Sequence, residues 1–224
     1  MSRDSWLQRL RVAGNDASAV EKLLLTDGLP DDGLQHAGQA VLRCSPTAGL
    51  IACAASLLEP LSRRGWTGDP ELIAELDHAR AGTMSELSLL PVDLDDLGAA
   101  LDESPASESF IDLDNGTPWP GELFDIGQGP DDFDADNSHR WLPVVGGGSK
   151  SAYGVMARFI PTIDSPGLAS RLRDEISGSG AFRRFNAELR RHDDEYTRWH
   201  RFRDDARLGH ARAWLADHGH RSIR

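Results

Sequence analysis

The sequence predicts an α+β protein that is mainly α-helical: an N-terminal helical bundle, then a small antiparallel sheet covered by C-terminal helices. Three observations predict this class. Apolar residues recur at helical spacing over most of residues 1–90. Asn115-Gly116 then lies between two extended segments, which is a strong local indication of a β-hairpin. Helical spacing returns after the glycines at 146–148. We expect two domains, residues 1–90 and residues 91–224.

About five helices are expected in residues 1–90. Asp16 is suited to cap one helix, and Pro46 to begin another after Ser45. Gly68-Asp69-Pro70-Glu71 is typical of a helix start, with Asp69 as the cap and acids near the positive end of the helix dipole. This segment therefore predicts a helical packing or docking domain.

The two cysteines, Cys44 and Cys53, lie in apolar helical surroundings. Their separation excludes a CxxC redox or zinc motif, so we expect two buried thiols.

Between residues 91 and 145 the periodicity changes. Residues 83–91 are expected to be a linker, and Asp93 could cap a short helix over 94–101. Pro118 and Pro120 cannot donate to a β-ladder, so the second hairpin arm should be short or at an edge. Residues 140–145 are expected to form a third strand.

Residues 125–138 form an acidic loop whose alternating acids from Asp132 resemble the start of a calcium-binding loop. Asn137 stands where that motif needs glycine, and position twelve falls on Pro143. A solvated acidic loop is therefore favoured, and we expect no metal site and no cofactor. The following three glycines lack the lysine-serine end of a phosphate-binding loop, so a flexible connection is expected.

The C-terminal part is expected to form several helices. Ser149 is a candidate cap for a helix whose large residues share one face, and Asp164-Ser165-Pro166 is expected to start the next. A long last helix from about Asp194 has an apolar stripe, and its interleaved arginines and acids are interpreted as mostly its solvated face. The stripe comprises Trp199, Phe202, Ala206, Ala213 and Trp214.

The segment 178–185, GSGAFRRF, allows two interpretations. In the structural one, the two glycines reverse the chain with positive φ, and Phe182 and Phe185 lie on a buried helix face. In the functional one, the free N–H groups of a helix start and one arginine hold an anion, while the other arginine pairs with Glu175 or Glu188. The candidate anion-binding residues are Gly178, Gly180, Arg183 and Arg184.

Aromatic side chains offer a second set of candidates. Trp119, Trp141 and Tyr153 are possible pocket-lining residues that could stack on a ring, or they could be core residues. Trp199 and Trp214 are expected in the core.

Several of these segments together resemble the bacterial uncharacterised protein family 0158. The matching residues, over roughly 91–220, are Ile111–Gly116, Trp141-Leu-Pro143, Tyr153 with Met156 and Phe159-Ile160, Gly178–Phe185, Trp199 with Phe202, and Trp214-Leu215. The sequence departs from the family in its three glycines after Val145. The resemblance implies a fold grouping and no established activity.

Charge narrows the function classes. The net charge is −12, but residues 171–224 contain 13 arginines against 9 acids. An acidic body makes nucleic acid an improbable partner, while the arginine-rich C-terminal region leaves a small anionic ligand, a protein partner or self-association open. No segment predicts a secretory signal or a membrane helix, and we expect a cytoplasmic protein.

The leading hypothesis is a non-enzymatic binding or regulatory module, because no catalytic constellation can be assembled. The alternative is an enzyme or binder acting on a phosphorylated or nucleotide-like molecule through the helix start at Gly178–Phe185, with Asp112 as general base.

Overall fold

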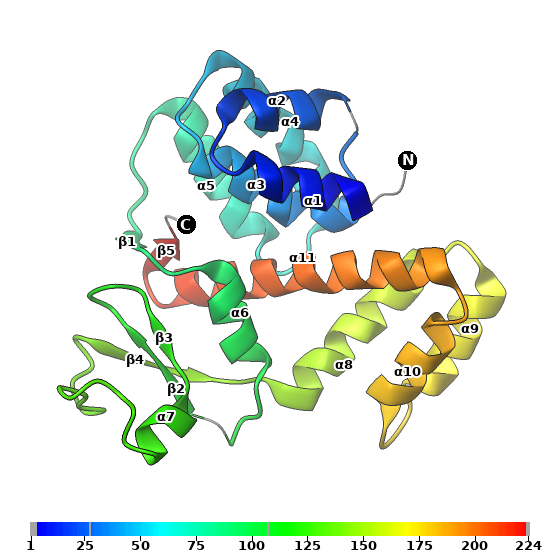
Figure 1. Ribbon diagram of the computed structural model, residues 1–224. Helices are drawn as coiled ribbons and strands as arrows, with labels where there is room; N and C mark the ends of the chain where they lie inside the picture. Colours follow the sequence, from blue (N-terminus) through cyan, green and yellow to red (C-terminus); the bar gives the residue numbers. More distant parts are fainter. Residues whose placement is uncertain (1–3, 27, 107, 223–224) are drawn as a thin grey trace.

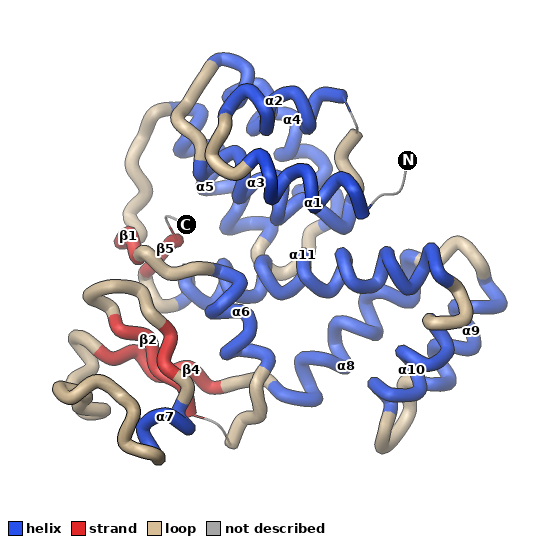
Figure 2. The backbone as a smooth tube through the Cα atoms, in the orientation of Figure 1, coloured by secondary structure: helices blue, strands red, loops and turns tan. Residues whose placement is uncertain are grey.

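A computed structural model describes residues 4–26, 28–106 and 108–222 of the chain. Helices dominate, and a small sheet lies at one end of the molecule (Figures 1 and 2). The predicted fold class, α+β and mainly α, is confirmed. In chain order the elements are α1 (Asp4–Ala13), α2 (Ala17–Thr26), η1 (Asp31–Gly33), α3 (Leu34–Arg43), α4 (Ala48–Arg64), α5 (Asp69–Ala81), β1 (Ser88–Leu90), α6 (Leu94–Asp102), β2 (Glu108–Asp112), β3 (Pro118–Trp119), α7 (Gly121–Asp125), β4 (Trp141–Val145), α8 (Gly148–Phe159), η2 (Ile160–Thr162), α9 (Pro166–Glu175), α10 (Ala181–Leu189), α11 (Asp193–Asp217) and β5 (His220–Ser222).

Helices α1–α5 form the predicted N-terminal bundle around one apolar core, which includes Cys44 and Cys53. Asp16 caps α2 as predicted, whereas α4 begins at Ala48 with Thr47 as its cap, two residues after Pro46. Asp16 accepts from the N–H groups of Ser18 and Ala19 at 3.0 and 3.1 Å. Both cysteines are buried and free, as expected, and burial raises their thiol pKa.

The start of α5 differs from the prediction. Gly68, with φ +87°, is the cap, and no side chain caps the helix. Asp69 is instead fully buried and binds Arg64, the last residue of α4. Gly68 is required here because a Cβ atom would lie 2.1 Å from the carbonyl oxygen of Gly209 in α11.

The sheet has the order β3-β2-β4 and is antiparallel throughout. The predicted hairpin at Asn115-Gly116 is confirmed, with Gly116 at φ +73°, and its second arm is the two-residue edge strand β3. One further pair was not predicted. Strand β1, in the segment taken for a linker, pairs in parallel with β5 after the last helix.

Helix α6 joins the sheet to the rest of the molecule. Ile111 and Val144 of the sheet are fully buried in one core with α6 and the C-terminal half of α11. Asp93 caps α6 as predicted, accepting from the N–H of Asp95 at 2.8 Å.

The connection at residues 146–148 is packed rather than merely a spacer. A Cβ atom on Gly146 would lie 2.2 Å from the carbonyl oxygen of Glu103, and the N–H groups of Gly147 and Gly148 donate to Leu101 and Glu103. Helix α8 begins at Gly148 without a side-chain cap, so the prediction of Ser149 as its cap was wrong.

Helix α11, 25 residues long, runs through the middle of the fold (Figure 1). It packs against α3, α5 and η1 on one side and against α6, α8 and α10 on others. Trp199 and Phe202 belong to the core of helices α8–α10, as expected. Trp214 is only half-buried, and the next residue, Leu215, is fully buried instead.

Three charged residues of α11 are buried, as exceptions to its mostly solvated polar face. Arg201, Asp205 and Arg212 are at most 3% exposed and face the N-terminal bundle. Their partners come from far earlier in the chain, so no local pattern in α11 could reveal them.

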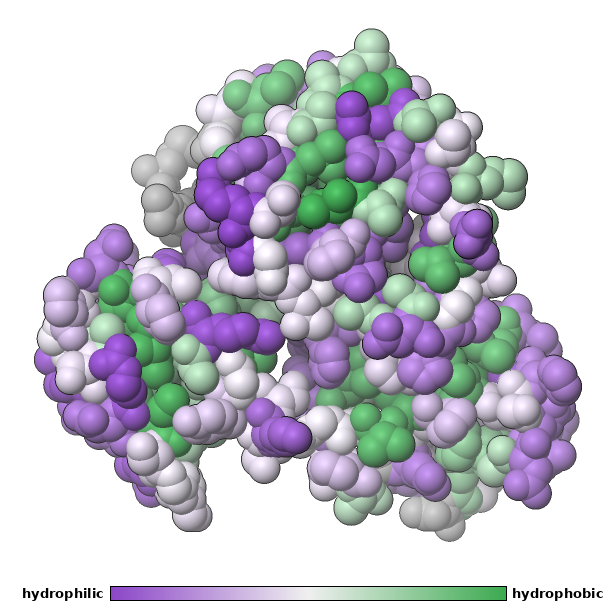
Figure 3. Space-filling model, turned by 180° about the vertical axis from the view of Figure 1, so that it is seen from behind, coloured by the Kyte–Doolittle hydropathy of each residue, from purple (hydrophilic) through white to green (hydrophobic). Residues whose placement is uncertain are grey.

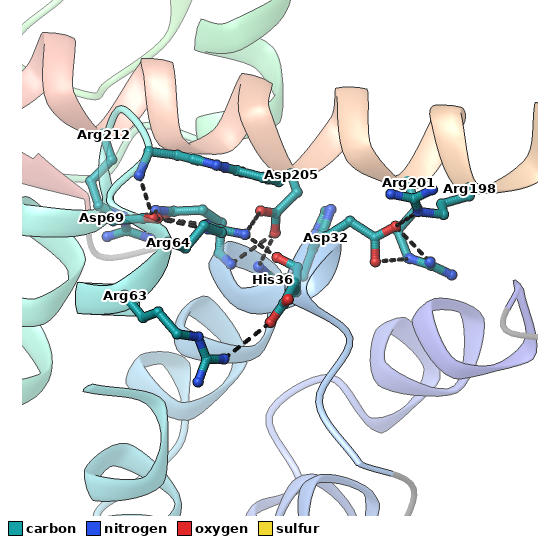
Figure 4. Close-up of polar contacts among 12 residues, drawn as sticks. Asp32, His36, Arg63, Arg64, Asp69, Arg198, Arg201, Asp205 and Arg212 are labelled. Atoms are coloured by element: carbon teal, nitrogen blue, oxygen red, sulfur yellow. Dashed lines mark hydrogen bonds and ion pairs between the residues drawn. The ribbon is translucent and has the colours of Figure 1, made fainter. Parts of the chain in front are cut away.

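One ionic network joins α11 to the bundle (Figure 4). The Arg64 guanidinium donates to Asp69 at 2.5 and 2.9 Å and to Asp205 at 2.6 Å. Asp205 also accepts from the backbone N–H of Gln35 at 2.8 Å. Arg212 binds Gln35, Gln39 and Glu75. A separate pair links Arg201 to Asp32 at 2.6 and 2.8 Å.

This network fixes which face of α11 lies toward the bundle. It therefore also fixes the opposite face, which lines the cavity described below.

Among the helices of the described ranges, none combines the length and the apolar composition of a membrane-spanning segment.

Candidate anion-binding site

A cavity of about 570 Å³ lies between α8 and α11 and opens to solvent. The last residue of α6, the first turn of α10 and Thr67 from the α4–α5 connection complete its walls. Viewed from behind, the surface is notched between the lobe of α8–α10 and the part that carries the sheet (Figure 3). The lining residues are Thr67, Asp102, Gly148, Lys150, Ser151, Ala152, Gly154, Val155, Arg158, Phe182, Trp199, Arg203, Ala206, Arg207 and His210.

The lining is strongly cationic for a protein of net charge −12. Four permanently cationic side chains line the cavity, together with His210, against the single acid Asp102. Such a charge excess in a concave site raises the local concentration of anions. The four cations are Lys150, Arg158, Arg203 and Arg207.

Two of these cations already have acidic partners. Arg207 donates to Asp95 at 2.9 Å, and Arg203 lies 3.7 Å from Asp204. Even so, the Nε–H of Arg207 is buried without an acceptor among the described residues. That hydrogen-bonding capacity remains available to a ligand.

Arg158 lacks such a partner. Its guanidinium donates to the hydroxyl of Thr67 at 3.2 Å, and no carboxylate in the described ranges forms an ion pair with it. Although water reaches Arg158 through the mouth of the cavity, the walls desolvate it and lower its pKa. An arginine stays protonated in spite of this, so the cavity contains an uncompensated positive charge.

Asp102 and His210 influence each other across the cavity. Desolvation by the walls raises the pKa of Asp102, against the opposing charges of Arg207, His210 and Arg203. Desolvation also lowers the pKa of His210, with the positive charge of Arg158 adding to the effect. His210 is therefore mostly neutral near pH 7, and a carboxyl and an imidazole face the same space.

The aromatic part of the lining comes from Phe182 and Trp199. Trp199 is 1% exposed and packs on Phe185, with ring centroids 4.9 Å apart. Phe182 is 45% exposed, so the prediction that it shares the buried face of Phe185 was wrong. The two residues are three apart on α10, and only Phe185 points fully into the core.

The predicted anion-binding segment lies beside this cavity, and only Phe182 of it lines the cavity. Gly178 and Gly180 both have φ +76°, as the helix-reversal interpretation requires. Arg184 donates to the carbonyl oxygens of Glu175, Ser177 and Ser179 at 3.1, 2.5 and 2.5 Å.

Arg184 therefore satisfies the C-terminal carbonyls of α9 and also pairs with the Glu175 carboxylate at 3.1 Å, as one interpretation expected. Arg183 is exposed and outside the cavity lining. An anion site made by Gly178, Gly180, Arg183 and Arg184 stays a prediction.

The other aromatic candidates lie elsewhere. Trp141 is 1% exposed and packs with Phe133 and Phe124 against the sheet, and Trp119 is half-buried in the same cluster. Tyr153 is 48% exposed on α8. The structure places none of Trp119, Trp141 and Tyr153 in the lining of the cationic cavity.

Asp112, the suggested general base, is held by the hairpin. Its carboxylate accepts from the N–H of Asp114 at 3.0 Å and from Arg140 at 3.2 Å. Arg140 also pairs with Asp132 of the acidic loop and lowers its pKa. Among the residues that the structure describes, no group of three or more His, Cys, Asp or Glu is placed to hold a metal ion.

Sequence reasoning missed the cationic cavity because its members come from five separate segments. One indication was present: the residues that α11 contributes recur at spacings of four, three, one and three, which places them on one helix face. Comparisons with protein-family models, curated proteins and solved structures find no match to the chain. The resemblance to family 0158 thus rests on the quoted residues alone.

Proposed function

We propose that the protein is a non-enzymatic binding module that holds a small phosphate-bearing or similarly anionic molecule in the cavity between α8 and α11. The observation that carries this proposal is Arg158, a solvent-accessible cation on the cavity wall whose hydrogen-bond partner is a neutral hydroxyl and which forms no ion pair among the described residues. An anion in the cavity would supply the missing counter-charge. Lys150, on the first turn of α8, adds a further cation to the lining.

A bacterial cytoplasmic location belongs to the same proposal. It is supported by the two buried free cysteines, which suit a reducing compartment.

A thermal-shift screen with inorganic phosphate, pyrophosphate and sugar phosphates tests the proposal. A ligand at about 100 times its Kd stabilises the fold by about 2.7 kcal/mol. For a chain of this size, that raises Tm by roughly 5–10 °C.

Arg158→Ala should weaken binding roughly 10- to 150-fold, because it removes charge-assisted hydrogen bonds. Arg183→Ala is the matched control, since it removes the same charge from an exposed position outside the lining. If no anion raises Tm, the proposal is refuted. If Arg183→Ala abolishes the shift and Arg158→Ala does not, the anion binds at the start of α10 instead.

An enzyme acting on the same kind of molecule is the second candidate, favoured by Asp102 and His210. A carboxyl with a raised pKa beside a neutral imidazole can exchange a proton with a bound substrate. This version uses Asp102 in place of Asp112, which lies outside the cavity lining. It predicts phosphate release from a generic phosphomonoester such as p-nitrophenyl phosphate and its loss in Asp102→Asn. A rate equal to the uncatalysed one removes this candidate for monoester substrates.

A further inference from the structure

The cavity has different chemistry at its two ends. On α11, the lining residues run from Trp199 through Arg203 and Arg207 to His210 on one face. At 1.5 Å per residue, this stripe is about 16 Å long. Asp102 acts electrostatically on His210 and Arg207, so the ionic end lies at the C-terminal end of the stripe. Trp199 marks the other end.

The Trp199 end is aromatic and apolar. Trp199 packs on Phe185 of α10, and Phe182, one turn earlier on the same helix, presents a ring that is 45% exposed. Val155 of α8 lines the same cavity and belongs to the same apolar group. An exposed phenylalanine on the wall of a cavity offers a surface on which a flat ring can stack.

Trp199 also has an unused donor. The side chain is 1% exposed, yet its Nε1–H has no acceptor among the residues that the structure describes. Buried indole N–H groups usually have a partner, and leaving one unsatisfied costs free energy. A ligand that reaches Trp199 with an acceptor atom would complete this hydrogen bond.

We infer that the ligand joins an anionic group to a planar ring that carries hydrogen-bond acceptors, that is, a phosphorylated nucleoside. The inference rests on the proposed function and narrows its ligand class. The phosphate lies among Arg158, Arg203 and Arg207, and the base lies against Phe182 and accepts from Trp199. A cavity of about 570 Å³ is within the range that holds a ligand of this size.

Isothermal titration calorimetry on the full chain tests the inference with adenosine 5′-monophosphate, uridine 5′-monophosphate and ribose 5-phosphate. Stacking and one added hydrogen bond should make the better nucleotide bind at least about tenfold more tightly than ribose 5-phosphate. Equal affinity of all three probes overturns the inference but leaves the proposed function standing. Absence of binding by every probe, and by pyrophosphate, refutes both.

Two variants locate the base. Phe182→Ala removes an exposed ring and should weaken nucleotide binding by roughly 5- to 100-fold, with ribose 5-phosphate unaffected. Trp199→Phe keeps one aromatic ring but removes the five-membered ring that carries the N–H, so it also leaves a space in the core. Urea denaturation should show a loss of stability, and nucleotide affinity should fall about tenfold while ribose 5-phosphate affinity is unchanged. Nucleotide affinity unchanged in both variants contradicts this placement of the base.

Discussion

Replacing Arg64 by methionine should be among the most destabilising single changes in this protein. The Arg64 side chain is 5% exposed, and it lies between two carboxylates, Asp69 and Asp205, that are at most 1% exposed. Methionine leaves both acids buried without their cation. Removal of one partner from a buried ionic group costs about 3–5 kcal/mol, because the remaining charge has lost its compensation. We expect a loss of this size in the free energy of unfolding at pH 8.

The loss should depend on pH. Desolvation already raises the pKa of Asp205 to about 6, against the opposing charge of Arg64. Without Arg64, the folded-state pKa of Asp205 rises further above the unfolded-state value. The folded state then binds protons that the unfolded state releases, so the deficit relative to wild type should narrow as the pH falls from 8 to 5.

Urea denaturation at pH 8 and pH 5 measures both effects, and Arg63→Met is the matched control. Arg63 is the preceding residue, but its side chain is 61% exposed and forms surface ion pairs with Glu59 at 3.1 Å and with Asp31 at 3.6 Å. Its replacement should cost less than about 1 kcal/mol at either pH. Equal losses in the Arg63 and Arg64 variants would refute the role assigned to the buried network.

Two further predictions concern the same interface. Burial lowers the pKa of His36 to about 4, whereas the pKa of the adjoining Asp205 is raised to about 6. Between pH 4 and 6, Asp205 binds a proton in the folded state that it does not bind in the unfolded state, whereas His36 binds a proton only in the unfolded state. As the pH falls, the two groups therefore change the free energy of unfolding in opposite directions. In His36→Gln the free energy of unfolding should therefore rise relative to wild type as pH falls through this window, and in Asp205→Asn it should fall, each by roughly 2–3 kcal/mol. Parallel curves for all three proteins in urea titrations would contradict these assignments. Gly68→Ala should cost about 2–5 kcal/mol, because it combines φ +87° with a Cβ 2.1 Å from the Gly209 carbonyl oxygen. Gly82→Ala, at φ +65° with nothing within 4 Å, should cost only the backbone strain of about 1–2 kcal/mol, and equal losses for the two glycines would show that the contact with α11 does not matter.

Local chemistry made much of the fold predictable. Asp16 and Asp93 are helix caps, and Asn115-Gly116 forms the hairpin turn, because each depends on neighbours within a few residues. Such features need no knowledge of the tertiary structure.

Features that depend on distant partners could not be predicted in this way. Asp69 has the pattern of a helix cap, yet it binds Arg64 and the Gln35 side chain inside the molecule. Asp205 and Arg212 have the pattern of a solvated helix face, but their partners lie more than 130 residues earlier in the chain. A single sequence does not show such pairings.

For the candidate site, the sequence suggested a class of ligand, a small anion, but not the residues that line the cavity. The arginine-rich C-terminal region left a small anionic ligand open, and the sequence pattern indicated Arg183 and Arg184, which follow two glycines, as its candidate partners. Arg184 instead binds the carbonyl oxygens at the end of α9. No sequence pattern around Arg158 indicates a role in binding. Its role in the proposed site depends on its position in the cavity wall without an ion-pair partner in the described part of the fold.

The most direct measurement is a crystal structure of the protein with bound inorganic phosphate. The account predicts phosphate density in the cavity, within hydrogen-bonding distance of the Arg158 guanidinium and near Arg203 or Arg207. Phosphate bound instead at Gly180 and Arg183, or an empty cavity at phosphate concentrations that raise Tm, would contradict it.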